Sequence, residues 1–180
     1  MISKNSQGGG MCKKVRGCWL SKMGRGVYEF MSKNNKNNIY RIYVDGSYNV
    51  GLKVGAYAFV VVDDDNMVVH RDCGVVVHVG LLAGHNIGCE CKAVVEALKW
   101  CVSSGVVCDI YYDLVNLRSW VQDLWNEKPW RTNMDYSQAY RYYIMNNRQH
   151  LRNMIKVKSH AGDYFNEMVN TMCNECYIKV

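Results

Sequence analysis

The stretch Tyr43-Val44-Asp45-Gly46-Ser47-Tyr48-Asn49 decides the fold expected for this chain. It joins an apolar segment, residues 39–44, directly to a carboxylate and a Gly-Ser pair. An unpaired charge at the end of a buried strand costs several kcal/mol or more, so Asp45 needs a partner. We interpret Gly46-Ser47 as a tight turn whose backbone N–H groups are open to an anion beside a metal. The same motif is also typical of an ordinary Asp-Gly turn, so further carboxylates arriving at this place would decide between the two.

Length and composition indicate one globular domain, or one domain with an arm. The chain has 180 residues, of which 49% are hydrophobic and 21% charged, and this composition argues against a disordered protein. No apolar run reaches the roughly 20 residues of a membrane span, and no secretory segment follows the first basic residues. We therefore expect an intracellular, cytoplasmic protein that does not bind a membrane and is a monomer.

The cysteines predict reduced thiols rather than disulfides. Their number is odd, nine, and the chain carries no signal peptide. Cys173 and Cys176 form an isolated C-x-x-C with no second pair at zinc-ligand spacing. We interpret most of the cysteines as small core residues, with a structural zinc at Cys173 and Cys176 as the alternative.

The net charge of +6 is concentrated at the start of the chain. Residues 1–38 carry eight Lys and Arg against one Glu, whereas the remainder carries 14 basic and 15 acidic residues. A flexible basic arm of this kind is typical of chains that follow a phosphate backbone. A solvated leader is the equal alternative, and organelle targeting is also open. We expect the folded domain to be residues 39–180.

Three strands joined by short turns predict an antiparallel meander. They cover residues 39–44, 55–62 and 67–79, and Gly74 suggests a bulge or bend in the third. The acidic run at residues 63–65 lies at the tip of the second hairpin. We interpret it as a solvated turn rather than a metal site.

From Gly88 the apolar period changes to that of a helix, which ends near Gly105. Glu90 lies in its first turn on the inward face, where a carboxylate either favours the helix dipole or meets Asp45. The next strand, residues 106–112, ends at Asp113. A right-handed crossover would pair this strand parallel to the first, so that Asp45 and Asp113 lie side by side where α/β sheets bind ligands.

The rest of the chain predicts three helices and one strand. The helices cover residues 114–125, 135–147 and 164–176, and the strand covers residues 150–158. The stretch 136–152 mixes tyrosines with Arg141, Arg148 and Arg152. Such a mixture is expected of a nucleic-acid surface, although some of the tyrosines are expected to pack on the sheet.

Four separated motifs resemble ribonuclease H of type 1. They are YVDGSYN at 43–49, NIGCE at 86–90, IYYD at 110–113 and VKSHAGDYFNEMVN at 157–170. The resemblance covers about residues 39–176 and is closest to the bacterial and phage-like branch, which has a Trp-basic-x-Asn connection like that at 130–133. It implies an α/β fold with a five-stranded mixed sheet, an antiparallel meander plus parallel strands, flanked by helices.

The same resemblance implies hydrolysis of the RNA strand of RNA–DNA hybrids, an endonuclease reaction that leaves 5′-phosphates. Two Mg2+ ions would serve as cofactors, with Mn2+ able to substitute. By position, Asp45, Glu90 and Asp113 would hold the ions, and clustered carboxylates do require cations to neutralise them. His160 corresponds to a mobile histidine that helps protons move or product leave.

The fourth catalytic and metal position departs from the family pattern. Where the family has an acid, this chain has Asn170, which offers a carbonyl oxygen but no charge. We expect the second metal to bind more weakly and activity to be reduced. The positions implied to contact the substrate backbone or the ribose 2′-hydroxyl carry small or amide side chains, namely Gly46, Ser47, Asn49, Asn86 and Asn133.

Two alternatives to the nuclease are open. The first is a catalytically weakened or inactive ribonuclease H fold that only binds nucleic acid, with adhesion supplied by the basic arm. The presence of Asp45, Glu90 and Asp113 together favours the enzyme. Integrase-like or resolvase-like chemistry is less favoured, because those families lack the Asp-Gly-Ser-Tyr-Asn and His-x-Gly motifs.

Overall fold

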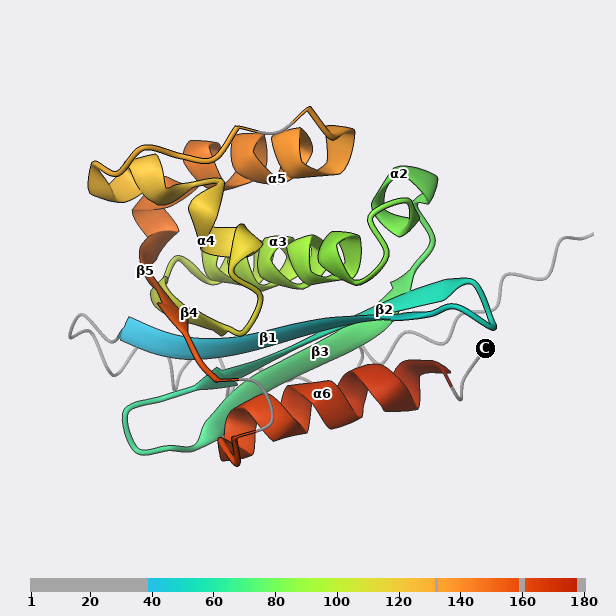
Figure 1. Ribbon diagram of the computed structural model, residues 1–180. Helices are drawn as coiled ribbons and strands as arrows, with labels where there is room; N and C mark the ends of the chain where they lie inside the picture. Colours follow the sequence, from blue (N-terminus) through green and yellow to red (C-terminus); the bar gives the residue numbers. More distant parts are fainter. Residues whose placement is uncertain (1–38, 132, 159–160, 178–180) are drawn as a thin grey trace, which may run out of the picture. The chain divides into compact units, whose positions relative to one another are not determined.

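The computed structural model describes residues 39–131, 133–158 and 161–177, and its centre is a five-stranded sheet (Figure 1). The strands lie in the order β3-β2-β1-β4-β5. Their bounds are β1 Ile39–Asn49, β2 Val54–Val62, β3 Val68–Val76, β4 Val107–Tyr112 and β5 Leu151–Lys156. β1, β2 and β3 pair antiparallel, whereas β4 pairs parallel to both β1 and β5. The predicted mixed sheet and the parallel β1–β4 pair are confirmed.

Helices cover both faces of the sheet (Figure 1). On one side lie α2, α3, α4 and α5, and on the other lies α6. Their bounds, with two 3-10 turns, are α2 Val79–Leu82, α3 Asn86–Ser104, α4 Asn116–Ser119, η1 Gln122–Trp125, α5 Asp135–Asn146, η2 Arg148–His150 and α6 Tyr164–Cys176.

Alternation along β1 divides the apolar residues between two cores. Ile42 and Val44 pack into the core on the α3 side, whereas Tyr43 packs into the core on the α6 side. This is the period of two expected for a strand buried on both faces. Cys173 and Cys176 are buried in the core on the α6 side, which agrees with the prediction that they are core residues.

β1 is longer than the sequence suggested, and the expected tight turn at Gly46-Ser47 is wrong. Residues 45–49 stay in the strand, because β2 pairs with them throughout, and the connection to β2 lies at residues 50–53. The glycine is needed for a different reason. A Cβ at Gly46 would lie 2.1 Å from the backbone nitrogen of Glu90, so only glycine lets α3 approach β1 this closely.

Three further expectations need correction. The single helix expected over residues 114–125 is instead α4 followed by η1, because the N–H of Trp130 donates to the carbonyl of Ser119 in place of a helical donor. β3 pairs regularly at Gly74, which makes room for the ring of Tyr57, and the register shift lies near the start of the strand, where Val61 pairs with His70 and Val62 with Val68. The short helix α2 was not anticipated.

The acidic hairpin tip is a turn, as predicted. A carboxylate oxygen of Asp63 accepts the N–H groups of Asp65 and Met67, and residues 64–66 are exposed. Among the helices of the described residues, none has the length and apolar character needed to cross a membrane.

Candidate functional site

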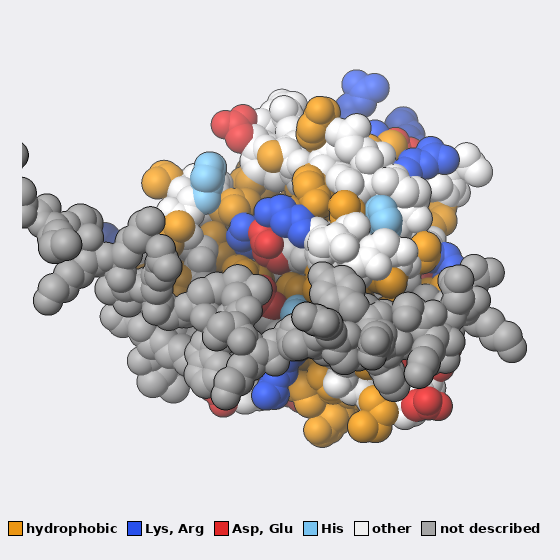
Figure 2. All heavy atoms as spheres, turned by 180° about the vertical axis from the view of Figure 1, so that it is seen from behind, with side chains coloured by type: hydrophobic (Ala, Val, Ile, Leu, Met, Phe, Trp, Pro, Cys, Tyr) orange, Lys and Arg blue, Asp and Glu red, His pale blue; other side chains and the backbone are white. Residues whose placement is uncertain are grey.

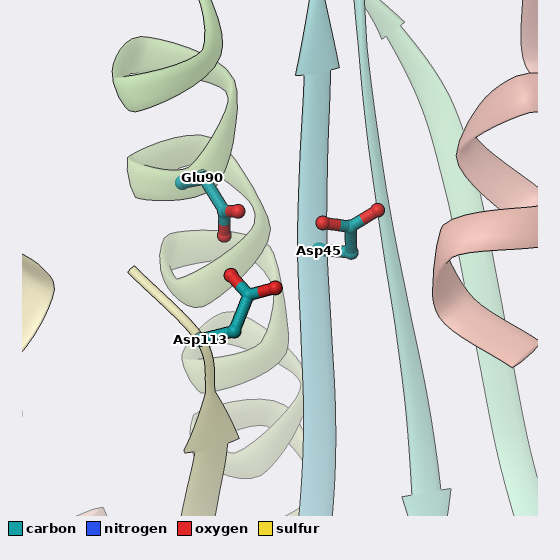
Figure 3. A group of neighbouring side chains, drawn as sticks. All are labelled: Asp45, Glu90 and Asp113. Atoms are coloured by element: carbon teal, nitrogen blue, oxygen red, sulfur yellow. The ribbon is translucent and has the colours of Figure 1, made fainter. Parts of the chain in front are cut away.

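Three carboxylates from three separate parts of the fold meet beside the carboxyl end of β4 (Figure 3). Asp45 projects from β1, Glu90 from α3, and Asp113 directly follows β4. One oxygen from each lies within 4.8 Å of the others. The parallel register explains the meeting of the two aspartates, because Tyr43 lies opposite Tyr111 and each aspartate follows two residues later. The predicted convergence of Asp45, Glu90 and Asp113 is therefore present in the structure.

Glu90 is the most deeply buried of the three. The sequence predicted Glu90 in the first turn of its helix. Because α3 begins at Asn86, Glu90 lies in the second turn instead. Its side chain is 5% exposed, and within the described residues its Oε2 has no hydrogen-bond partner. Burial raises the pKa of this carboxyl well above its usual range, and the neighbouring Asp45 and Asp113 raise it further. A buried, unsatisfied carboxylate oxygen facing two other acids is suited to a cation.

Asp45 is held at the base of the site from two sides. Burial raises the pKa of its carboxyl, and Asp113 adds to this, whereas the N–H of Gly46 partly offsets both. The thiol of Cys173, on α6, donates to the backbone carbonyl of Asp45 at 3.3 Å. β1 is therefore in contact with α3 on one face and with α6 on the other where it carries the carboxylate.

The carboxylates open into a cleft of about 260 Å³. Among the described residues its lining contains no Lys or Arg and is rich in carboxylate and amide oxygens. The lining residues are Asp45, Gly46, Ser47, Asn86, Glu90, Asp113, Leu114, Asn166 and Asn170. Mg2+ and Mn2+ prefer oxygen ligands of this kind. The donor set and the unsatisfied oxygen of Glu90 together fit a divalent cation.

Most of the predicted substrate and metal residues lie in this cleft, and two do not. Asn170 lies beside the acids, as do Gly46, Ser47 and Asn86. Asn49 lies outside the lining, and its Oδ1 accepts the N–H of Leu52 in the β1–β2 connection. Asn133 is exposed ahead of α5 and also lies outside the lining. The prediction for His160 falls outside the described residues, as does the arm at 1–38.

Sequence reasoning missed Asn166. It is 6% exposed and lines the cleft beside Asn170. A signal was available, because the two asparagines are four residues apart in a predicted helix and so share one face.

The stretch 136–152 does not present a continuous basic and aromatic surface. Arg141 forms an ion pair with Asp123, and Arg152 forms one with the buried Asp109. Tyr140 is buried, with its hydroxyl donating to the carbonyl of Leu117. Figure 2 likewise shows Lys and Arg side chains beside Asp and Glu on the rear face. The alternative in which tyrosines of this stretch pack inward is confirmed for Tyr140.

The fold and the cleft together define an α/β protein with an acidic site at the carboxyl ends of adjacent parallel strands. The family model described as RNase H matches residues 37–177. The chain belongs to the RNase H family. Its assignment to the bacterial and phage-like branch stays a prediction.

Solved structures share the fold at low identity. RNase H1 from the halophilic archaeon Halobacterium salinarum superposes with a TM-score of 0.60 at 17% identity, covering 78% of this chain and 98% of that one. LC11-RNase H1 from compost, in complex with RNA/DNA hybrid, superposes with a TM-score of 0.54 at 15% identity, covering 77% of this chain and 99% of that one. The foamy viral protease-reverse transcriptase, also in complex with RNA/DNA hybrid, superposes with a TM-score of 0.60 at 12% identity, covering 80% of this chain and 20% of that one. A comparison with curated proteins gave no match.

Proposed function

We propose that this protein is a metal-dependent endoribonuclease that hydrolyses the RNA strand of RNA–DNA hybrids and leaves 5′-phosphate and 3′-hydroxyl ends. The observation that carries the proposal is the meeting of Asp45, Glu90 and Asp113 within 4.8 Å, with one buried oxygen of Glu90 unsatisfied. Family membership and two hybrid-bound structures of the same fold support the substrate.

In this proposal Asp45, Glu90 and Asp113 would together hold two Mg2+ ions, with Mn2+ able to substitute. The chemistry that such ions supply is a more acidic water nucleophile and stabilisation of negative charge on the phosphate and leaving oxygen. The protein contributes the arrangement of the carboxylates. Burial raises the pKa of Glu90 and of Asp45, and a bound cation would stabilise their charged forms against this effect.

Recognition of RNA is assigned to the neutral wall of the cleft. Ser47 and Asn86 line it beside the acids, and hydroxyl and amide groups suit the ribose 2′-hydroxyl, which both donates and accepts. Asn86 uses its Oδ1 to accept the N–H of Tyr48, so it offers a substrate its N–H donors. Gly46 also lines the cleft, and because α3 fills the space of a Cβ there, its backbone is the group that a substrate would meet. His160 stays a proposed contributor to proton movement or product release.

Asn170 supports the second candidate function, a binding module without catalysis. It lies in the cleft at a position where an acid would add a charge, and its amide cannot act as a base. With three acids rather than four, a second cation is held more weakly. The binding module would hold hybrid without any divalent ion, through salt-sensitive contacts that survive the loss of Asp45.

The deciding experiment is incubation of the purified full-length protein with an RNA–DNA hybrid labelled on the RNA strand, with Mg2+, with Mn2+ and with a chelator. We expect internal cleavage of the RNA strand with either metal and none with the chelator. Asp45→Asn removes one charge from the cleft and should abolish cleavage. Asp64→Asn makes the same chemical change at the exposed hairpin tip and should leave cleavage unchanged.

Two results would count against the nuclease. One is that neither the wild type nor Asn170→Asp cleaves the hybrid with either metal. The other is cleavage that persists in Asp45→Asn. Hybrid binding that is retained with the chelator and in Asp45→Asn, without cleavage by the wild type, would favour the binding module.

A further inference from the structure

Beyond the acidic cleft, β1 and the first turn of α3 are joined to each other. The backbone N–H of Tyr48 donates to Oδ1 of Asn86 at 2.8 Å. The rings of Tyr48 and His85 are stacked, with centroids 4.6 Å apart and planes only 6° from parallel. Both contacts lie outward from the carboxylates, three residues past Asp45 along the strand and four or five residues before Glu90 along the chain.

His85 makes this contact from an unfavourable backbone conformation. Its φ is 49° and its ψ is −130°, outside the regions that residues with a Cβ commonly adopt. Such a conformation persists only where surrounding contacts hold it, and it is found preferentially near functional sites. Here the stack on Tyr48 is one such contact, beside two backbone hydrogen bonds, in which the N–H of His85 donates to the carbonyl of Leu82 and the carbonyl of His85 accepts the N–H of Cys89. The residue that follows His85, Asn86, accepts the N–H of Tyr48.

A second contact joins the same two elements nearer the carboxylates. A Cβ on Gly46 would lie 2.1 Å from the nitrogen of Glu90 and 2.2 Å from the carbonyl carbon of Cys89, so the backbones of β1 and α3 touch there. That contact limits how closely the helix approaches the strand. The buried face of α3 beyond Glu90 packs into the core shared with β1, and the join at Tyr48 adds a second contact with β1 at the first turn of the helix, ahead of Glu90.

The two points together set where Glu90 lies. Asn86 and Glu90 are four residues apart in α3, so they project from the same face one turn apart. Asp45 and Tyr48 are three residues apart in one continuous strand. A displacement of Asn86 relative to Tyr48 therefore displaces the carboxylate of Glu90 relative to that of Asp45.

We propose that Tyr48, His85 and Asn86 form a clamp that positions Glu90 against Asp45, so that the cleft is arranged for a divalent cation before nucleic acid binds. Tyr48 and His85 are positioning residues in this proposal and do not touch the cation. The proposal rests on the metal site of the proposed function. It adds that the affinity of the free protein for metal depends on an aromatic pair outside the ligand set.

The test measures Mn2+ binding to the metal-free, full-length protein by calorimetry, without nucleic acid. His85→Gly and Tyr48→Ala each remove one ring of the stack, whereas His85→Phe and Tyr48→Phe keep a ring in place. His85→Gly is the most informative variant, because glycine adopts the backbone conformation of His85 without strain and the fold is retained. Urea unfolding of each variant in a chelator reports stability separately.

We expect the two ring-removing variants to bind Mn2+ about three- to tenfold more weakly, the range that corresponds to the loss of one aromatic pair. The ring-retaining variants should stay within about twofold of wild type, and the urea midpoint of His85→Gly should not fall below the wild-type value. The concentration of Mg2+ that gives half-maximal cleavage should rise in the same order as the loss of Mn2+ affinity.

Unchanged Mn2+ affinity in His85→Gly would overturn the clamp. So would an equal loss in His85→Phe and His85→Gly, since the imidazole itself and not the stack would then matter. A weaker apparent affinity for hybrid with unaltered Mn2+ binding would also overturn it, because it would assign His85 to direct substrate contact. If the wild type binds no Mn2+, the metal site of the proposed function fails and the clamp fails with it.

Discussion

Replacement of Gly46 by alanine tests the close approach of α3 to β1. The added Cβ would lie 2.1 Å from the nitrogen of Glu90, 2.2 Å from the carbonyl carbon of Cys89 and 2.6 Å from its oxygen. Ordinary contact begins at 3.4 Å, so the backbones must separate by about 1.3 Å, the difference between 3.4 and 2.1. All three clashing atoms belong to the backbone of α3, so no side-chain rotation relieves them.

This separation has two measurable consequences. Overpacking of a rigid contact costs typically 1–3 kcal/mol, and we expect Gly46→Ala to lower the free energy of unfolding by about 3 kcal/mol. Because Glu90 moves with the helix, the carboxylates also separate. A misplacement of about 1 Å at a reacting centre costs on the order of 100-fold in rate, and we expect a loss of that size in hybrid cleavage.

The assay combines urea unfolding with initial rates of hybrid cleavage at saturating Mg2+. Gly51→Ala is the matched control, because its Cβ would meet only Oδ1 of Asn49 at an ordinary 3.4 Å. The control should change stability by no more than about 0.5 kcal/mol and leave the rate unchanged. The reasoning is refuted if Gly46→Ala unfolds within about 0.5 kcal/mol of wild type and cleaves at the wild-type rate.

Three further predictions follow from the same contacts. Asn170→Asp should raise the rate at limiting Mg2+ several-fold, because it adds a charge to the cleft, and a lower rate would contradict the weaker second site. The raised pKa of Glu90 means that the folded, metal-free protein keeps a proton that the unfolded chain loses, so stability should fall as the pH rises above about 4.5. In urea titrations with a chelator, Glu90→Gln should reduce this fall and be more stable than wild type at pH 8, and an unchanged pH dependence would contradict the assignment. Arg152→Ala leaves the buried carboxylate of Asp109 without its ion-pair partner and should lower the urea midpoint. The fall should be clearly larger than that of Arg118→Ala, whose ion pair is on the surface. Equal falls would show that the buried ion pair stabilises the fold no more than the surface one.

Local sequence pattern was sufficient for the order of most elements and for two of the three acids. The apolar period of a strand or helix is carried by adjacent residues, so the strands around Asp45 and before Asp113 could be located without a structure. The handedness of the crossover then placed their ends together. The same period showed that Glu90 faces inward, and its burial agrees.

Contacts between distant segments decided what the pattern could not. Gly46 has the sequence signature of a turn, yet it lies within a strand because β2 pairs with residues 45–49, and α3 packs directly against it there. The helix expected after Asp113 breaks up because Trp130 supplies the hydrogen bond that would have continued it. Neither residue carries a local signal for this outcome, since in each case the deciding partner belongs to a different segment of the chain.

The sequence by itself determined the family of this protein and the acids of its site, because these depend on residue types in a fixed order. Only the tertiary structure decided that an oxygen of Glu90 is buried with no hydrogen-bond partner in the described part of the chain, and that Tyr48 is joined to both His85 and Asn86. Burial and stacking arise when segments separated by tens of residues pack together, so they become visible only in the folded molecule.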